Sequence, residues 1–143
     1  IAALAAALGA EPAEVWSGHY GVAVFEDAAT VRGLKPDIAA LETIVLDLAE
    51  SRGNLVVAAR SDDPAFDVVD RFFAPGSGVP EDPATGSAHC ILAPLYAEKL
   101  GRPTVRFFQA FPGRGGEIET ELRGDRVRLR GRAFTFAESR LRL

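Results

Sequence analysis

The segment Gly86–Leu100 constrains the fold most, because its apolar residues cover most of the circumference of a single helix. Thr85 can cap the first turn, Gly101 can end the last turn, and Lys99 suits the C-terminal end of the helix dipole. Pro94 lies inside the segment and should bend the helix or remove one hydrogen bond. A helix that is apolar on nearly all sides is expected to be buried. The sequence therefore predicts one central buried helix.

Most of the remaining chain has the patterns of strands, separated by Gly, Pro, Asn and Asp residues. A further helix should open at Lys35-Pro36-Asp37, continue at helical spacing to about Glu50 and close at Gly53-Asn54. One long buried helix with many surrounding strands indicates an α+β fold with a curved, barrel-like sheet around that central helix. The other expected elements are a helix over Ile1–Leu8 and strands over Val15–Phe25, Leu55–Ala59 and Phe66–Phe73.

The C-terminal part of the chain predicts a β-ribbon with complementary charges. Glutamates alternate with uncharged residues before a turn at Gly124-Asp125, and arginines alternate with apolar residues after it. Side chains alternate between the two faces of a strand, so each set shares one face. In matching register the opposite charges contribute roughly a few tenths of a kcal/mol per pair. The residues are Glu117, Glu119, Glu121, Arg126, Arg128 and Arg130, and the strand before them places Val105, Phe107 and Gln109 on one face.

The composition excludes several classes of protein. The chain has 143 residues, enough for one domain with a core, and 48% hydrophobic and 25% charged residues are typical of a soluble domain. The net charge is −4 without a block of like charges, which argues against a nucleic-acid partner. No apolar run approaches the roughly 18 residues of a membrane span. The single cysteine, Cys90, allows no internal disulfide and fits a cytoplasmic location.

The chain contains no methionine and begins with Ile1. Because translation starts with methionine, we expect further residues upstream. We therefore interpret residues 1–143 as a single lobe of a longer protein.

The loop expected before the central helix, Ala74–Thr85, has the pattern of a ligand site. Pro80 and Pro83 flank Asp82 and favour an extended backbone there. Gly86 and Ser87 begin the helix, so their backbone N–H groups lack helical partners and, with the helix dipole, favour a carboxylate or phosphate. Gly86 permits close approach of a ligand, and the Ser87 hydroxyl can add a hydrogen bond. Asp82 beside such an anion cradle would suit proton transfer on an acid substrate. A well-capped helix start after a rigid loop explains the same residues, and both interpretations remain open.

Other candidate sites have less support. Asp82, Ser87 and His89 are the residue types of a hydrolase triad, but Ser87 and His89 lie two residues apart on one helix and should diverge. There is also no G-x-S-x-G elbow. Adjacent His89 and Cys90 without a second matched pair are poor zinc spacing, so we expect no metal site and a small buried role for Cys90. The glycine-rich segment around Arg114 predicts a turn, from which Arg114 could meet an anionic ligand.

Two segments, Asp70-Arg71-Phe72-Phe73-Ala74-Pro75-Gly76 and Gly78-Val79-Pro80-Glu81-Asp82-Pro83-Ala84-Thr85-Gly86-Ser87-Ala88-His89-Cys90, resemble the C-terminal lobe of PhzF-like proteins. This phenazine-biosynthesis family is related to diaminopimelate epimerase. Arg114-Gly115-Gly116-Glu117 and the final Arg-rich hairpin follow the same pattern. The resemblance implies a diaminopimelate epimerase-like fold of two similar lobes, with the active site between them and the N-terminal lobe absent from this chain. Gly86–Leu100 would be the central helix of the lobe.

The resemblance also implies residue roles. Gly86 and Ser87 would bind the substrate carboxylate through N–H groups, Asp82 would line the site, and His89 would have a supporting role. The family's reaction is cofactor-independent isomerisation by proton abstraction and return, with a glutamate of the N-terminal lobe as general acid/base. Nothing in this chain matches that glutamate segment. We therefore expect a small carboxylic-acid substrate, no cofactor, the N-terminal lobe as partner and a homodimer of the intact protein.

A second hypothesis is a non-catalytic ligand-binding or dimerising module that retains the anion cradle. A glutamate in the matching segment of an N-terminal lobe would favour the isomerase, and its absence would favour the module. An amino-acid epimerase with paired cysteines is disfavoured, because no cysteine stands just before Gly86 and Cys90 lies inside the predicted helix.

Overall fold

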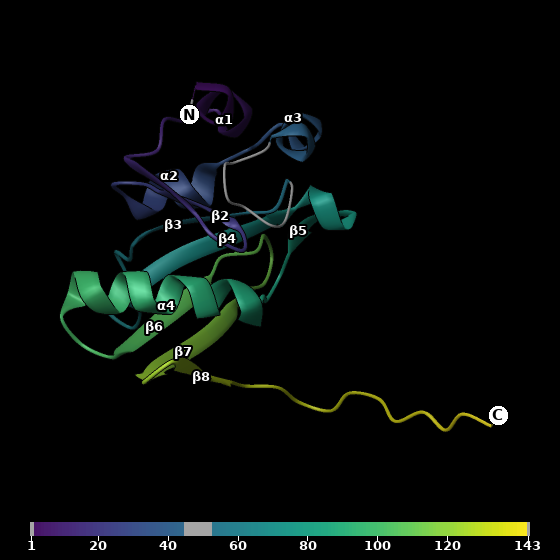
Figure 1. Cartoon of the computed structure of the whole chain (residues 1–143). Helices are drawn as coiled ribbons and strands as arrows, with labels where there is room; N and C mark the ends of the chain where they lie inside the picture. The colour runs from purple at the N-terminus through teal and green to yellow at the C-terminus, as the bar shows by residue number, and fades with distance from the viewer. Residues whose placement is uncertain (1, 45–52, 143) are drawn as a thin grey trace.

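The computed structural model describes residues 2–44 and 53–142, which form a mixed sheet with helices on both faces (Figure 1). The mixed α+β architecture predicted from the sequence is confirmed. The helices are α1 (Ala2–Leu8), α2 (Ala28–Gly33), α3 (Ile38–Thr43) and α4 (Gly86–Leu100), with a short 3-10 helix η1 (Pro75–Ser77). The strands are β1 (Glu14–Ser17), β2 (Gly21–Val24), β3 (Leu55–Arg60), β4 (Val68–Ala74), β5 (Val79–Asp82), β6 (Thr104–Gln109), β7 (Gly116–Arg123) and β8 (Arg126–Gly131).

The described strands form an eight-stranded sheet in the order β1-β2-β3-β4-β6-β7-β8, and β5 pairs with β4 off this path. β2 runs parallel to β3 and β4 runs parallel to β6, whereas the other neighbours are antiparallel. The parallel pair β4–β6 is connected through η1, β5 and α4. This connection carries the candidate ligand loop and places it beside the central strands.

Alternation along the central strands divides the core between the two faces of the sheet. In β3, Leu55 and Val57 pack with residues of α1, α2 and α3, whereas Val56 and Ala58 pack with residues of α4. β4 is buried along its whole length. The sequence of a strand that is covered on both faces is usually a continuous run of apolar residues. This explains the wholly apolar sequence of Leu55–Ala59, whose assignment as a buried strand is confirmed.

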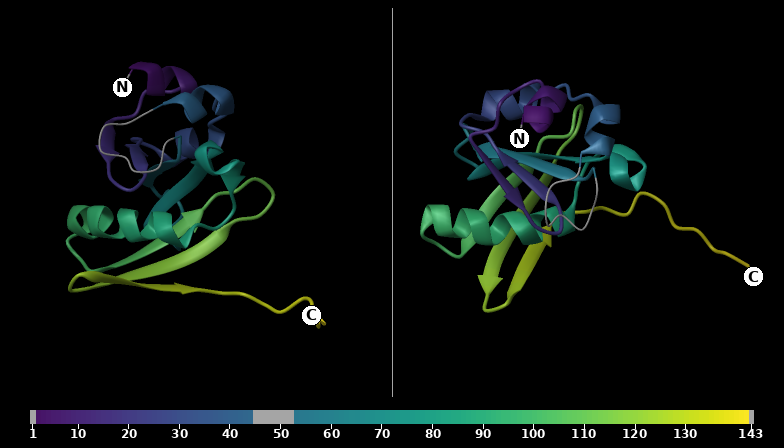
Figure 2. Two further views of the ribbon diagram at one scale, coloured as in Figure 1. Left: turned by 45° about the vertical axis from the view of Figure 1, so that its right-hand side comes forward. Right: turned by 45° about the horizontal axis from the view of Figure 1, so that its top comes forward.

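Helix α4 has the bounds predicted from the sequence, but only one of its sides is buried. Leu92 and Tyr96 face the sheet, whereas Ser87, Cys90 and Pro94 are exposed. The sheet curves part of the way round α4 (Figures 1 and 2), yet within the described residues β1 and β8 are its ends and it is not closed. The predicted barrel-like enclosure is therefore incomplete. The prediction that Cys90 is buried is wrong, because no described strand covers the outer side of α4.

Three further predictions need correction near the N-terminus. Val15–Phe25 is not one strand but the hairpin β1–β2, in which Ser17 pairs with Gly21 across a short turn. Helix α2 was not predicted; Asp27 caps it by accepting a hydrogen bond from the Thr30 N–H at 2.7 Å. Asp37 caps α3 as expected, but α3 ends at Thr43 and Ile44 is extended. The rest of the predicted helix, 45–50, lies outside the described residues.

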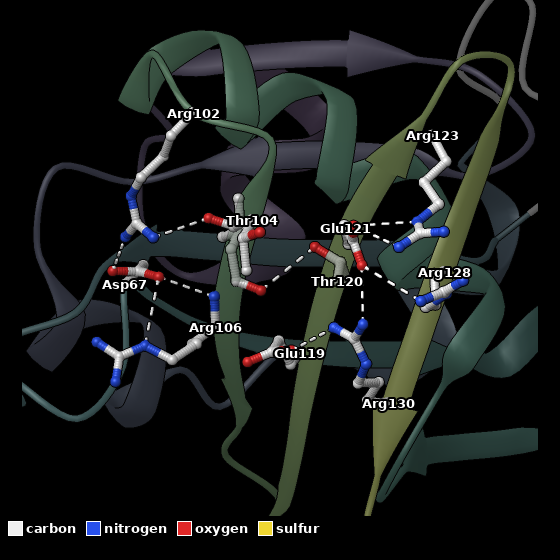
Figure 3. A network of polar contacts seen from close by, with 11 residues as sticks. Asp67, Arg102, Thr104, Arg106, Glu119, Thr120, Glu121, Arg123, Arg128 and Arg130 are labelled. Carbon is white, nitrogen blue, oxygen red and sulfur yellow. Dashed lines mark hydrogen bonds and ion pairs between the residues drawn. The ribbon is translucent and has the colours of Figure 1, made fainter.

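The register of the β7–β8 hairpin matches the alternating charges of its two strands, so glutamates and arginines pair across it (Figure 3). Glu119 lies opposite Arg130, and Glu121 lies opposite Arg128. Arg130 donates to Glu119 at 2.6 Å and to Glu121 at 2.8 Å. The turn between the strands is Gly124-Asp125, as expected, and Gly124 has φ 61°.

After β8, residues 132–142 have no regular secondary structure and extend away from the rest of the chain (Figure 1). Phe134, Phe136 and Leu141 are 88%, 90% and 86% exposed in this segment. Among the described residues, no helix is long and apolar enough to cross a membrane.

Candidate functional site

The candidate loop is more ordered than its prolines and glycines predict. The expected loop Ala74–Thr85 contains η1 and the strand β5, which pairs with β4 so that Asp82 lies opposite Phe72. Only 83–85 then separate β5 from the first residue of α4. Asp82 is therefore the last residue of a paired strand, held close to the N-terminus of α4.

The side chain of Thr85 holds Asp82 and leaves the first turn of α4 without a side-chain cap. The Thr85 hydroxyl donates to the Asp82 carboxylate at 2.5 Å. Thr85 is the N-cap residue, yet its side chain makes no capping hydrogen bond, so the expected Thr85 cap is wrong. The backbone N–H groups of Gly86 and Ser87 thus lack a partner from this side chain, and both residues are exposed. This geometry suits an anion beside a fixed carboxylate.

The buried amide group of Gln109 holds the loop in place through hydrogen bonds. Its Oε1 atom accepts from the Thr85 N–H at 2.7 Å, and its Nε2 atom donates to the Asp82 carbonyl at 2.6 Å and to the Thr85 hydroxyl at 3.1 Å. Gln109 is 0% exposed. The sequence offered one signal, a polar side chain on the same strand face as Val105 and Phe107, but nothing that named its partners.

The glycine-rich segment before β7 lies against the same loop. A Cβ atom on Gly116 would lie 3.2 Å from the Cβ atom of Ala84, and one on Gly115 would lie 2.3 Å from the ring of Phe108. These glycines therefore permit close packing, while the predicted turn is at Gly113, with φ 81°. Arg114 is exposed.

Glu81 has a structural partner. Arg71 donates to both carboxylate oxygens of Glu81, at 2.8 and 2.9 Å, and also to the carbonyl of Leu34 at 2.8 Å. The two side chains are largely buried, at 6% and 15% exposure. This bidentate pair ties β5 to the end of α2, so Glu81 anchors the loop while Asp82 faces Thr85.

His89 lies inside the protein and points away from the exposed Ser87. Its Nδ1 atom lies 2.7 Å from the Thr85 carbonyl, and its Nε2 atom lies 3.2 Å from the Asp70 carboxylate. Burial by itself would lower the pKa of His89, but the charge of Asp70 and the hydrogen bonds to Asp70 and Thr85 together raise it. His89 and Ser87 diverge as expected, which excludes the triad geometry. His89 supports the N-cap carbonyl of α4 and is 0% exposed.

Asp82, Gly86 and Ser87 are the predicted site residues that the structure brings together, at one end of α4. A residue from elsewhere in the chain joins them: the Tyr20 hydroxyl lies 3.1 Å from the Ser87 hydroxyl. Sequence reasoning missed this contact, because Tyr20 lies in a different hairpin.

The chain is similar in sequence and in structure to known proteins of one family. The sequence matches the family described as "Phenazine biosynthesis-like protein" over residues 4–139. The chain belongs to this PhzF-like family. An uncharacterized isomerase of Pseudomonas aeruginosa is 41% identical over 138 residues, which cover 96% of this chain and 49% of the relative. An uncharacterized isomerase of Halalkalibacterium halodurans is 36% identical over 137 residues, covering 95% and 49%.

A solved structure shares the PhzF-like fold. The crystal structure of a PhzF family phenazine biosynthesis protein from Enterococcus faecalis superposes with a TM-score of 0.79 at 33% identity, covering 93% of this chain and 50% of that protein. The chain thus spans about half the length of the curated relatives that it matches.

A separate hollow of about 410 Å³ lies over the β6–β7–β8 strands of the chain. Phe66, Arg106, Glu119 and Arg130 are among its lining residues, and the candidate loop is not. Within 2–44 and 53–142, no group of three or more His, Cys, Asp or Glu side chains could hold a metal ion.

Proposed function

We propose that this chain is the carboxylate-binding half of a cofactor-independent isomerase that transfers a proton on a small carboxylic acid. The observation that carries the proposal is the uncapped first turn of α4 beside the fixed carboxylate of Asp82. Relatives that share 41% and 36% of their aligned residues with this chain are named isomerases, which supports the reaction class.

In the proposed site, the substrate carboxylate accepts hydrogen bonds from the Gly86 and Ser87 N–H groups and from the Ser87 hydroxyl. The helix dipole and these donors favour a negative charge at this position. Asp82 lines the site beside the substrate. Its carboxylate accepts a hydrogen bond from the Thr85 hydroxyl, and its backbone carbonyl accepts one from Gln109. His89 has a supporting role, because its ring forms a hydrogen bond with the Thr85 carbonyl on the inner side of the loop.

The isomerisation needs one group that removes a proton from carbon and returns it to another carbon of the same molecule. No redox partner is required, because the atoms and electrons of substrate and product are the same. We propose that this general acid/base is a glutamate of an N-terminal lobe, facing α4 in a two-lobe, diaminopimelate epimerase-like arrangement. The half-length match to the relatives supports a second lobe of similar size.

Isothermal titration of the chain with sodium benzoate and cyclohexanecarboxylate tests the carboxylate site. The decisive variant is Ser87→Pro, which removes both the N–H and the hydroxyl of Ser87 at the second position of α4, where proline is sterically tolerated. Ala39→Pro is the matched control, because Ala39 is exposed at the same position of α3. We expect Ser87→Pro to abolish binding and Ala39→Pro to leave the affinity unchanged.

Wild-type chain that binds neither carboxylate, or a Ser87→Pro variant that binds as tightly as the wild type, would count against the site. The gene sequence upstream of Ile1 then separates the two functions. A glutamate in the segment that matches the first lobe of the relatives would support the isomerase. A segment without it would favour a non-catalytic binding or dimerising module with the same cradle.

A further inference from the structure

The β1–β2 turn reaches the proposed carboxylate site through a single side chain. Tyr20 lies in this turn, 67 positions from Ser87 in the sequence, and the two hydroxyl oxygens are 3.1 Å apart. Tyr20 is half-buried and Ser87 is exposed, so the hydroxyl pair lies at the surface end of the contact. The pair connects a separate hairpin to the first turn of α4.

The ring of Tyr20 is held on two sides. Its centroid lies 4.9 Å from that of Phe72 and 4.6 Å from that of His19. Phe72 lies opposite Asp82 in the β4–β5 pairing. Phe72 therefore supports both the ring of Tyr20 and the backbone of Asp82. This arrangement fixes the Tyr20 hydroxyl relative to Asp82 and to the first turn of α4, the two ends of the proposed site.

Hydroxyl chemistry determines the direction of the hydrogen bond when an anion is present. A serine hydroxyl has one hydrogen to donate and two lone pairs that accept. A carboxylate only accepts, so a bound carboxylate requires Ser87 to donate its single hydrogen outward. Tyr20 must then be the donor to Ser87. A donor behind the serine polarises its hydroxyl and strengthens the bond to the anion.

We propose that Tyr20 is a positioning residue for the carboxylate site: its hydroxyl selects the rotamer of Ser87 and donates to Ser87 while Ser87 donates to the ligand. This inference rests on the proposed function. Tyr20 acts through Ser87 and has no contact with the reacting carbon atoms. The turn between β1 and β2 is thereby part of the ligand site, although none of its residues belongs to the loop motif.

A double-mutant cycle with Tyr20→Phe, Ser87→Ala and the double variant tests the proposal, with sodium benzoate as the probe. Phenylalanine keeps the ring contacts with Phe72 and His19 and removes only the hydroxyl. We expect Tyr20→Phe to weaken benzoate binding roughly two- to tenfold, the range for one neutral hydrogen bond. In the Ser87→Ala background the same change should have no further effect.

Tyr96→Phe is the matched control, because it removes the other tyrosine hydroxyl of the chain, which makes no hydrogen bond within the described residues. It should leave benzoate affinity unchanged. If Tyr20→Phe lowers benzoate affinity equally with and without the Ser87 hydroxyl, the proposal is overturned, since the tyrosine would then act on the fold alone.

A second readout needs no ligand. The Hα–Hβ scalar couplings of Ser87 should report one χ1 rotamer in the wild type and rotamer averaging in Tyr20→Phe. Unchanged couplings would overturn the positioning role. Wild-type protein that fails to bind benzoate would contradict the proposed function. The Ser87 couplings would still decide whether the Tyr20 hydroxyl fixes the rotamer of Ser87.

Discussion

His89 and Asp70 form a buried ionisable pair directly behind the N-terminus of α4. The Thr85 carbonyl can only accept, so the Nδ1 atom of His89 must carry a hydrogen at their 2.7 Å contact. The Nε2 atom then faces the Asp70 carboxylate at 3.2 Å, and a raised pKa of His89 favours a second hydrogen there. An imidazolium between two acceptors is thus the form that this interior stabilises. Phe107 packs edge-on against the ring and excludes water.

This pair predicts a pH dependence of stability. Because the folded protein raises the pKa of His89 above about 6.5, its usual value, the folded state binds more protons than the unfolded state above that pH. The free energy of unfolding should therefore fall as pH rises from about 6.5 through the folded pKa, by at most about 1.4 kcal/mol per pH unit. Urea denaturation between pH 6 and 9 measures it.

Asp70→Asn removes the charge that raises the pKa, so this variant should lose most of the slope. If the variant does not fold, the NMR titration of the His89 ring in the wild type provides the same information. A free energy of unfolding that stays level or rises between pH 6.5 and 8 would contradict the prediction.

Among the elements, α4 combines a well-closed C-terminal end with a proline in its interior. Gly101 closes the helix in the left-handed conformation, with φ 65°, and its N–H bonds to the carbonyls of Ala97 and Glu98. Pro94, by contrast, lies inside the helix on its exposed side and lacks the N–H that would bond one turn back. Tertiary packing of Leu92 and Tyr96 against the sheet keeps the helix intact across this position.

We expect Pro94→Ala to stabilise the chain. The helix propensity difference is about 3 kcal/mol, and the more flexible unfolded chain offsets about 0.4–1 kcal/mol of it. Thermal and urea unfolding should show a net gain of roughly 1–2 kcal/mol, since tertiary packing already offsets part of the cost of the proline. Pro64→Ala, in an exposed turn, is the matched control and should lower stability slightly. A loss of stability in Pro94→Ala would contradict this prediction.

At the scale of the whole molecule, the chain leaves apolar surface uncovered. The outer side of α4 exposes Cys90 and Pro94, and the terminal segment 132–142 exposes Phe134 and Phe136 almost completely. Exposed apolar surface of this kind marks interaction sites in soluble proteins. The relatives are about twice as long as this chain, so a second lobe or a second subunit is the partner that we propose for it.

We therefore expect the chain to self-associate when it is studied alone. Sedimentation velocity over a range of concentrations should show a dimer or larger species, and the double variant Phe134→Ser/Phe136→Ser should shift the equilibrium toward monomer. Val79→Ser is the control, because it removes an apolar side chain that is 43% exposed on β5, away from the terminal segment. A monomer at all concentrations, or an equal effect of Val79→Ser, would contradict this expectation.

Features that depend on local periodicity and turn residues could be predicted from the sequence. These are the bounds of α4, the buried strand at Leu55–Ala59 and the turn at Gly124-Asp125 between β7 and β8. Each follows from a few neighbouring residues, because apolar spacing, glycine conformations and charge alternation act within one element. The same local patterns predicted one strand over Val15–Phe25, where the structure has a hairpin.

Which distant groups meet at the candidate site depends on the tertiary structure. Gln109 reaches Asp82 and Thr85, Asp70 reaches His89, and Tyr20 reaches Ser87, across separations of 19 to 67 positions. The partner of a polar side chain depends on which strands become neighbours and how the sheet curves, and no local pattern encodes that. The exposure of Cys90 has the same cause: its helix is apolar nearly all round, but this part of the fold covers only one side.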